Sequence, residues 1–363
     1  MSVDIGIIGL VKSGRSTIFN TLTRGKADTG SSAPHIGIAK VPEPRLNTLA
    51  DMLHPKRVVP AEVRYFDIGA SVKSLADEKA PSDQFLRQIS NVDTLINVVR
   101  AFADESIPHP EGSLDVERDI AAMNLELAFY DLALLERRLK RIEDSLKGAK
   151  PPERQTLLRE QEMLMKIKDN LEKDIPIREL SLTRDEVRMI AGYQFLTAKP
   201  LLILANIGEE QLPQAASLET ELGSHYSRPN CRLTTVCGKL EMELGQLDNS
   251  AADELRAEFG IKESGPERII KLSYELLGLI SFFTTVSDEV KVWSIKNGTE
   301  AVKAAGKIHS DMERGFIRAE VISYNDFVKC GSLAEARKKG LLRLEGKNYI
   351  VQDGDVITFL FNV

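Results

Sequence analysis

Residues 9–17 read GLVKSGRST and come at the end of the apolar run VDIGIIG at residues 3–9. A phosphate-binding loop of the form G-x-x-x-x-G-K-[S/T] wraps backbone N–H groups around nucleotide phosphates. Its Lys reaches the β- and γ-phosphates, and its Ser or Thr hydroxyl binds Mg²⁺. Gly9, Gly14 and Ser16 match this pattern, and Arg15 stands at the Lys position. The stretch therefore predicts a strand, a phosphate-binding loop and a helix. Arg15 replaces the Lys that should contact the phosphates.

Short apolar runs recur along the chain and are separated by helical stretches. They predict strands buried in a mostly parallel sheet, and they are VDIGIIG (3–9), EVRYFDI (62–68), LINVVRA (95–101), LLILAN (201–206) and RLTTV (232–236). Strands that alternate with helices indicate an α/β fold. Candidate nucleotide motifs stand at the ends of three of these strands, at Gly9, Asp67 and Asn206, which is where doubly wound sheets bind ligands.

A heptad pattern of apolar residues occupies the middle of the chain. Its members step by three and four residues, and they are Leu125, Ala128, Leu132, Leu135, Leu139, Ile142 and Leu146. KGAKPP (147–152) interrupts the pattern, and helical spacing resumes at Leu157, Leu164, Ile167 and Leu171. This pattern predicts an antiparallel helical hairpin inserted into the α/β domain, with arms up to about 50 Å long at about 1.5 Å per residue.

The predicted hairpin carries a concentration of positive charge. Ten basic and five acidic residues lie between Arg137 and Lys168, a local balance of +5 in a chain of net charge −6. A solvated helix face is the usual reason for such a charged run. Binding of an RNA phosphate backbone is the alternative, and its candidate residues are Arg137, Arg138, Lys140 and Arg141.

The last segment of the chain predicts a separate small module. KVWSI (291–295) and RAEVIS (318–323) are typical of strands, and AVKAAGKIHSDM (301–312) is typical of a helix. NYIVQDGDVITFLFNV (348–363) predicts a β-hairpin that turns at Asp353-Gly354. Strands around one helix in a short segment predict a β-grasp module, in which no catalytic constellation is evident.

Composition limits the class of protein. With 42% hydrophobic and 28% charged residues, the chain is typical of a globular protein and not of a disordered one. No apolar run is long enough for a membrane span, and the start of the chain lacks the features of a signal peptide, so we expect a cytoplasmic protein with no membrane partner. Its three cysteines and five histidines lack metal-binding spacing. The acidic net charge argues against a protein that coats nucleic acid with its whole surface.

Two further motifs bear on a nucleotide site. Asp67 in YFDIGAS stands where a D-x-x-G switch motif would hold Mg²⁺ through water, but Ala70 replaces the glycine and lacks its φ freedom. An Asp that caps a turn at a strand end is the structural alternative. In NIGE (206–209), Glu209 replaces the Asp of N-K-x-D, which accepts hydrogen bonds from guanine. Because Glu is one methylene longer, we expect guanine to lose this partner.

The whole set of motifs resembles the YchF family of Obg-like ATPases nearly from end to end. The motifs that carry the resemblance are GLVKSGRSTIFNTLT (9–23), VPEPRLNTLADMLHPKRVVP (41–60), YQFLTAKPLLILANIGE (193–209), AAGKIHSDMERGFIRAEVI (304–322) and GKNYIVQDGDVITFLFNV (346–363). The resemblance implies an α/β P-loop NTPase with a mostly parallel sheet, an inserted antiparallel coiled-coil hairpin and a C-terminal TGS domain of β-grasp type. The corresponding boundaries are 1–114 with 192–280, 115–191, and 281–363.

The resemblance also implies ligands and partners. It implies ATP, in preference to GTP, together with Mg²⁺ held by Ser16 and Asp67, and ribosome association through the hairpin tip and the TGS domain of a monomeric protein. Arg15 and Asp67 are the candidate catalytic residues. The residues that would contact nucleotide are Gly9, Lys12, Ser13, Gly14, Arg15, Ser16, Thr17, Asn206, Ile207, Glu209, Cys237 and Gly238.

Departures from the family pattern cluster around the hydrolytic motifs. The family loop G-L-P-N-V-G-K-S-T is altered at Val11, Lys12, Ser13 and Arg15. The switch I pattern T-I-E-P-N-V-G of the family appears as SSAPHIG (31–37), after a connection several residues shorter. The D-I-A-G-L segment of the family is DIGAS here, with Ser71 at an apolar position. These changes favour a protein that binds nucleotide and hydrolyses it slowly. The alternative is a catalytically degenerate paralogue that serves as an RNA- or ribosome-binding scaffold.

Overall fold

The structure is a computed structural model, and it describes residues 3–25, 35–68, 89–226, 228–286 and 288–362. Two compact units are present. One contains Asp4–Gly37 and Arg64–Pro266, and the other contains Ile38–Val63 and Glu267–Val363. The domain boundaries predicted from the sequence stay predictions, although the grouping of Ile38–Val63 with the C-terminal part of the chain was not expected from the order of the motifs.

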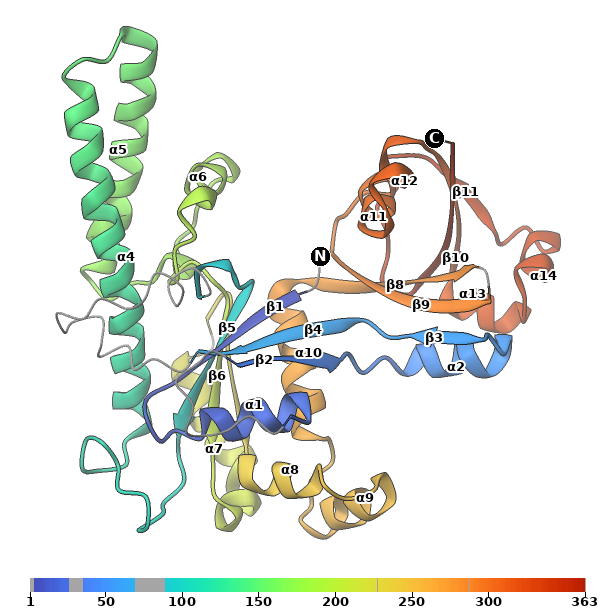
Figure 1. Cartoon of the computed structure of the whole chain (residues 1–363), viewed down its shortest axis with the longest axis horizontal. Helices are drawn as coiled ribbons and strands as arrows, with labels where there is room; N and C mark the ends of the chain where they lie inside the picture. The colour runs from blue at the N-terminus through green and yellow to red at the C-terminus, as the bar shows by residue number, and fades with distance from the viewer. Residues whose placement is uncertain (1–2, 26–34, 69–88, 227, 287, 363) are drawn as a thin grey trace. The chain divides into compact units, whose positions relative to one another are not determined.

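A mostly parallel sheet forms the first unit (Figure 1). Its described strands run in the order β2-β4-β1-β5-β6-β7, and β1, β5, β6 and β7 pair in parallel. Their bounds are β1 Val3–Ile8, β2 His35–Lys40, β4 Glu62–Asp67, β5 Thr94–Arg100, β6 Leu201–Asn206 and β7 Cys231–Val236. All five strands predicted for this sheet are confirmed, and β2 is an additional strand.

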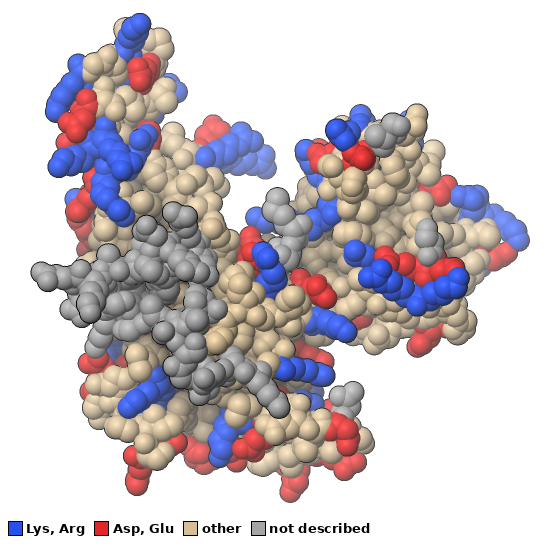
Figure 2. Space-filling view, in the orientation of Figure 1, with Lys and Arg blue, Asp and Glu red and all other residues tan. Residues whose placement is uncertain are grey.

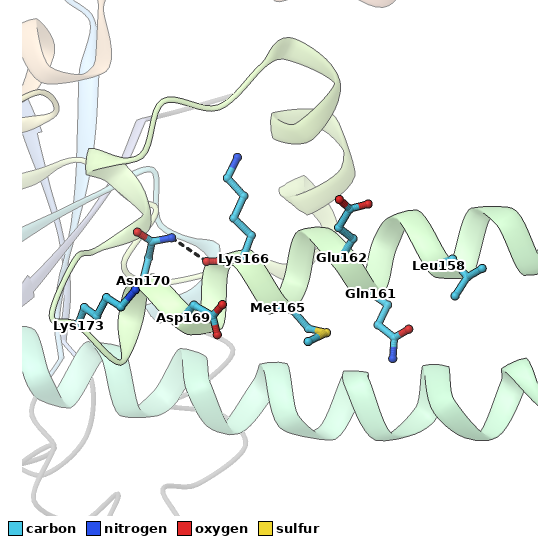
Figure 3. Close-up of a pocket in the computed structure, with 8 residues that line it drawn as sticks. All are labelled: Leu158, Gln161, Glu162, Met165, Lys166, Asp169, Asn170 and Lys173. Atoms are coloured by element: carbon cyan, nitrogen blue, oxygen red, sulfur yellow. Dashed lines mark hydrogen bonds between the residues drawn. The ribbon is translucent and has the colours of Figure 1, made fainter.

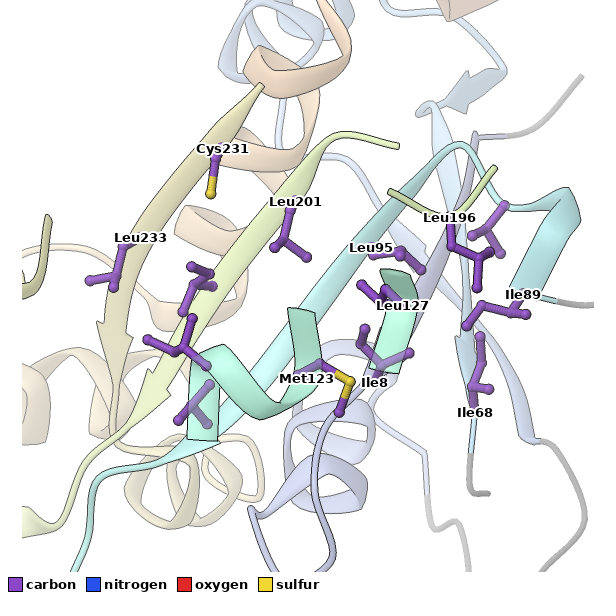
Figure 4. Close-up of a cluster of buried hydrophobic side chains, with 14 residues drawn as sticks. Ile8, Ile68, Ile89, Leu95, Met123, Leu127, Leu196, Leu201, Cys231 and Leu233 are labelled. Atoms are coloured by element: carbon purple, nitrogen blue, oxygen red, sulfur yellow. The ribbon is translucent and has the colours of Figure 1, made fainter. Parts of the chain in front are cut away.

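Helices and short 3₁₀ turns connect these strands. The α-helices are α1 Arg15–Thr23, α4 Val116–Leu146, α5 Pro151–Leu171, α6 Arg184–Ile190, α7 Ala215–Tyr226, α8 Gly238–Leu244 and α9 Asn249–Glu258. The 3₁₀ turns are Ile177–Glu179, Ala191–Tyr193 and Glu209–Gln214. Figure 4 shows one buried cluster, in which Met123 and Leu127 of α4 pack with Ile8, Leu95 and Leu201 of the sheet. The base of α4 is thus part of the core that supports the sheet.

The helical hairpin consists of α4 and α5, joined across residues 147–150. Its apolar seam matches the predicted heptad pattern from Ala128 to Leu146, and Leu157, Leu164, Ile167 and Leu171 of α5 complete it. The prediction that Leu125 belongs to the seam is wrong, because this residue is 43% exposed. The seam therefore begins one step later, where α4 extends beyond the sheet.

A buried carboxylate anchors the hairpin where the chain returns to the sheet. Asp131 of α4 accepts hydrogen bonds from the backbone N–H groups of Leu196 and Thr197 at 2.9 and 2.8 Å, and from the Thr197 hydroxyl at 2.6 Å. Burial raises the pKa of Asp131 to about 6, against the effect of these donors. The carboxylate therefore fixes the segment that leads into β6, the strand that ends at Asn206.

The second unit contains a mixed sheet with helices packed against it. Its strand order is β11-β10-β12-β8-β9-β3, with β3 Arg57–Val59, β8 Leu279–Val286, β9 Glu289–Lys296, β10 Phe316–Ser323, β11 Arg343–Glu345 and β12 Asp355–Phe361. The helices are α2 Pro44–Leu53, α10 Gly265–Leu277, α11 Ala301–Ile308, α12 Ser310–Arg314, α13 Tyr324–Cys330 and α14 Leu333–Lys338. Ala301, Ala304 and Ala305 of α11 pack against Phe282 and Ile357 of the sheet, as a β-grasp module requires.

The predicted β-hairpin over residues 348–363 is wrong in its first arm. Only β12 forms there, and it pairs antiparallel with β10 and parallel with β8. The Asp353-Gly354 turn instead binds β8, because the Ser281 N–H donates to the Asp353 carboxylate and the Gly354 N–H donates to the Ser281 carbonyl. These bonds hold the turn beside β8. The residues before the turn therefore do not form the first strand of a hairpin.

Arg45 explains why residues 38–63 belong to this unit. Its guanidinium binds Glu43 and Asp353, with nitrogen–oxygen distances of 2.7 and 2.8 Å in the two ion pairs. It also lies over the Phe283 ring, 5.4 Å from the centroid. These contacts join α2 to the C-terminal sheet. None of the helices within the described ranges combines the length and apolarity of a membrane span.

Replacing Leu135 by Ala should destabilise the hairpin. Leu135 is fully buried in the seam between α4 and α5, so its truncation removes apolar burial and leaves a cavity, at a cost of about 2–5 kcal/mol. Leu125→Ala, at an exposed position of the same helix, should cost no more than about 0.5 kcal/mol. Denaturant unfolding followed by circular dichroism compares the two variants. Equal losses would contradict the assigned seam.

Candidate nucleotide-binding site

The loop between β1 and α1 has the tight turn that a phosphate cradle requires. Gly14 adopts φ +88°, and a Cβ there would lie 2.1 Å from the Asn206 amide nitrogen. At Gly9 a Cβ would lie 2.4 Å from the Val98 carbonyl oxygen. Both positions therefore exclude side chains. Lys12 takes a left-handed conformation as well, with φ +65°.

The start of α1 presents donors that no side chain caps. Gly14 is the N-cap and provides no acceptor, and the N–H groups of the first turn, which includes Arg15, Ser16 and Thr17, have no intrahelical partners. The Ser13 hydroxyl is buried and makes no hydrogen bond among the described residues. Because a helix N-terminus favours negative charge, these residues fit the phosphates of a nucleotide.

Arg15 does not point freely into the loop. Its Nε donates to Asp67 Oδ1 at 2.6 Å, and its Nη1 donates to the Gly9 carbonyl at 3.2 Å. The Ser16 hydroxyl donates to the other carboxylate oxygen of Asp67 at 2.9 Å. The Asp67 side chain is only 4% exposed. The structure therefore brings together Arg15, Ser16 and Asp67, which the sequence singled out.

The same arrangement does not fit a divalent cation between Ser16 and Asp67. Mg²⁺ is bound by oxygen ligands, and each oxygen of Asp67 accepts one hydrogen bond, from Arg15 or from the Ser16 hydroxyl. A guanidinium also stands within hydrogen-bond distance of the carboxylate that would bind the metal. The cation beside Asp67 in this structure is Arg15, and an Mg²⁺ site at Ser16 and Asp67 stays a prediction.

Asn206, at the end of β6, ties the loop to the neighbouring strands. Its Nδ2 donates to the Ser13 carbonyl at 3.0 Å, and its Oδ1 accepts from the Gly238 N–H at 3.0 Å. The side chain is buried. One amide therefore connects the phosphate-binding loop, β6 and the start of α8.

The residues predicted to meet the base lie at the adjoining ends of β6 and β7. Ile207, Cys237 and Gly238 are buried there, and the Ile207 N–H donates to the Val236 carbonyl, which holds the two strand ends together. Glu209 is half-buried and pairs with Lys239 at 3.1 Å, and this hydrogen bond raises the pKa of Lys239. A carboxylate is thus held at the rim beside the buried residues.

Phe102, which the sequence analysis missed, lies beside the loop. Its ring comes 3.9 Å from the position of a Cβ on Gly14, and the Arg100 guanidinium lies 4.6 Å from its centroid. The buried Arg100 also donates to the Phe102 carbonyl. An apolar ring next to Asn206 offers a surface for stacking a base. The sequence could have indicated this residue, because an aromatic side chain follows directly after the predicted strand LINVVRA.

Lys12 is exposed and directs its Nζ to the Pro108 carbonyl at 3.3 Å, so it contacts the segment after β5. Ala70, Ser71 and residues 31–34 of the switch I segment lie outside the described residues.

The RNA candidates differ in their contacts. Arg137, Lys140 and Arg141 are exposed on α4, and Figure 2 shows Lys and Arg side chains gathered on the hairpin, interspersed with acidic ones. Arg138, by contrast, forms an ion pair with Glu160 of α5 at 2.7 Å and donates to the Tyr193 hydroxyl at 3.1 Å. Arg138 therefore joins the two helices.

A shallow hollow lies along the hairpin, away from the loop. The residues that line it come from α5 and its C-terminal end, and Figure 3 shows Leu158, Met165 and Lys166 among them. Acidic and basic side chains alternate there, with Glu162 and Asp169 near Lys166 and Lys173. It lacks the glycine-rich backbone of a phosphate site, so we do not assign the nucleotide to it.

Comparisons with known proteins match the chain over its whole length. The Bacillus subtilis (strain 168) protein named ribosome-binding ATPase YchF is 38% identical over 370 residues, covering 100% of both chains. The protein of that name from Escherichia coli O157:H7 is 35% identical over 368 residues, also covering 100% of both. A family model described as YchF-GTPase_C, protein of unknown function (DUF933), matches residues 279–362. The solved structure of the Schizosaccharomyces pombe YchF GTPase has a TM-score of 0.84 and 30% identity, covering 99% of this chain and 98% of that one.

Replacing Asn206 by Ala should damage the loop itself. The change leaves the Ser13 carbonyl and the Gly238 N–H without their partner, and each buried unpaired group costs about 1–3 kcal/mol. We expect a lower free energy of unfolding and weaker binding of adenine and guanine nucleotides alike. Asn170→Ala is a matched control, since its Nδ2 bonds only to a carbonyl of its own helix. Calorimetric melting and titration with both nucleotides measure the effects, and an unchanged melt would contradict the structural role of Asn206.

Proposed function

The chain belongs to the YchF family, and on that premise we propose that it is a cytoplasmic, ribosome-associated protein that binds ATP in preference to GTP and hydrolyses it slowly. The observation that carries nucleotide binding is the Asn206 amide, which holds the glycine-rich loop against the ends of β6 and β7. The uncapped start of α1 and the Phe102 ring both lie beside this contact. Phosphates and base then have separate binding surfaces.

The preference for ATP is argued from Glu209. An Asp at that position would accept hydrogen bonds from the guanine N1–H and 2-amino groups, and the extra methylene of Glu changes the position of the carboxylate. Its pairing with Lys239 at 3.1 Å further commits one oxygen. Guanine would then bury polar groups without partners, which is costly, whereas adenine has no N1–H to satisfy.

Slow hydrolysis is argued from Arg15. Its Nε is bound to Asp67, so the charge that a P-loop Lys places on the β- and γ-phosphates is shared with a buried carboxylate. Catalysis of phosphoryl transfer depends on stabilising charge that develops in the transition state. Arg15 is less available for this, while the backbone donors of the loop still bind the ground state.

Ribosome association is proposed from the relatives and from surface charge. The relatives from Bacillus subtilis and Escherichia coli are named as ribosome-binding. Here Arg137, Lys140 and Arg141 are exposed on α4, where a phosphate backbone can reach them. The hairpin and the C-terminal β-grasp module are the proposed contact regions.

A scaffold without nucleotide turnover is the second candidate. It is favoured by one observation, the Arg15–Asp67 ion pair in the position where a metal would bind. The first candidate binds ATP and hydrolyses it slowly, whereas the scaffold binds nucleotide weakly or not at all. A scaffold that has lost its ligand shows no saturable binding of ATP or GTP in a calorimetric titration.

Changing Glu209 to Asp should shift base preference towards guanine. The shorter carboxylate regains the pose that accepts from guanine, and one such recognition pair is worth about 1–3 kcal/mol, or roughly tenfold to a hundredfold in Kd. Glu210→Asp, at the exposed neighbouring position, is the control and should leave the ratio unchanged. Competition titrations of ATP and GTP give the ratio directly. GTP binding as tight as ATP binding in the unmodified protein would refute the proposal.

Charge reversal at the exposed hairpin residues should weaken ribosome binding. We expect the combined Arg137→Glu, Lys140→Glu and Arg141→Glu variant to co-sediment less with ribosomes, most strongly at low salt, because phosphate contacts release counterions. Nucleotide affinity should remain within about twofold, since distant sites act independently. Arg138 is left intact because its ion pair joins α4 to α5.

The matched control reverses the same number of charges elsewhere in the same unit. Lys173, Arg184 and Arg188 are exposed, and their conversion to Glu alters the net charge equally. If both triple variants lose the same amount of co-sedimentation, net charge alone is responsible. Unchanged co-sedimentation of the Arg137, Lys140 and Arg141 variant would show that these charges form a solvated helix face and do not bind the ribosome.

A further inference from the structure

We propose that the Arg15 guanidinium takes the place of the divalent cation in this site, so that the protein binds nucleotide independently of Mg²⁺. The inference rests on the proposed nucleotide binding and goes beyond it, because it states which cation the site uses. It is carried by the contacts of three residues, Arg15, Ser16 and Asp67.

Each oxygen of the Asp67 carboxylate already accepts one hydrogen bond. Arg15 Nε lies 2.6 Å from Oδ1, and the Ser16 hydroxyl lies 2.9 Å from Oδ2. The carboxylate is almost completely buried, so an unpaired state would be strongly unfavourable. A divalent ion at Asp67 would have to displace Arg15 or stand beside its positive charge. The ion pair therefore competes with the metal for the same carboxylate.

A guanidinium can serve Asp67 and a phosphate at the same time. It carries five N–H donors in a planar fork. Two of them are used in the described structure, one by Asp67 and one by the Gly9 carbonyl, and Nη2 has no hydrogen-bond partner among the described residues. Arg15 is also the first residue of α1, beside the uncapped N–H groups. The remaining donors are therefore available at the phosphate end of the site.

A Lys at position 15 would act differently. Its ammonium is a compact point charge, and when it moves to the β- and γ-phosphates it leaves Asp67. The carboxylate then needs another cation, which is the role that Mg²⁺ has in the family pattern. In this chain Arg15 keeps its contact with Asp67 and has further donors for a phosphate, so charge neutralisation of the phosphates does not depend on a metal.

The test is a calorimetric titration of the full-length chain with a non-hydrolysable ATP analogue, in excess Mg²⁺ and in excess EDTA. We expect the two Kd values of the unmodified protein to agree within about threefold. For Arg15→Lys, binding in Mg²⁺ should be modestly tighter than in the unmodified protein, and binding in EDTA should be at least about tenfold weaker than in Mg²⁺.

Three outcomes are distinguishable. Binding of the unmodified protein in Mg²⁺ but not in EDTA overturns this inference and leaves the proposed nucleotide binding intact. No binding in either condition overturns the proposed function, and the inference falls with it. Equal binding in both conditions by the unmodified protein, together with Mg²⁺ dependence in Arg15→Lys, supports the inference.

Ser16→Ala provides a second test that does not depend on the folding of Arg15→Lys. The variant removes the hydroxyl that would ligate a metal in the family pattern. We expect any loss of affinity to be the same factor in Mg²⁺ and in EDTA, because no metal is bound there. A loss confined to the Mg²⁺ condition would overturn the inference. Circular dichroism and melting of each variant verify the fold.

Discussion

A buried carboxylate has to be paired, and in this protein the pairing of Asp67 determines the form of the nucleotide site. Asp67 ends β4, while its partners Arg15 and Ser16 begin α1. The ion pair and the hydroxyl bond thus fix the helix start to the sheet. Because the same helix start carries the free N–H donors, the contact that orders the site also sets its charge.

The proposed function divides the site into residues that would bind nucleotide and residues that would hydrolyse it. Asn206 binds the Ser13 carbonyl and the Gly238 N–H, and these two bonds hold the glycine-rich loop to the ends of β6 and β7. The hydrolytic part depends on charge placed at the phosphates, and here Arg15 is shared with Asp67. Under the proposed function, the same substitution would preserve nucleotide binding and weaken catalysis. The hairpin is anchored by Asp131 to the segment that leads into β6, the strand that ends at Asn206.

Periodicity and strand ends predicted much of the fold. The five strands of the parallel sheet and the hairpin seam from Ala128 are found in the structure, because continuous apolar runs and heptad spacing report burial directly. The β-hairpin predicted from residues 348–363 did not form its first strand. The Asp353 carboxylate and Gly354 instead bind Ser281, which lies on a strand distant in sequence. The roles of Arg15 and Arg138 were equally hidden. Each depends on a partner, Asp67 or Glu160, whose proximity arises only from the tertiary fold.

The central claim is that Arg15 and Asp67 remain paired while nucleotide is bound. A crystal structure of the protein with a non-hydrolysable ATP analogue and Mg²⁺ tests it most directly. The account predicts that Arg15 Nε stays within hydrogen-bond distance of Asp67, that another N–H of the guanidinium contacts a phosphate, and that no metal ion links Ser16 to Asp67. An Mg²⁺ ion held by Ser16 and Asp67, with Arg15 turned away from the carboxylate, would contradict it.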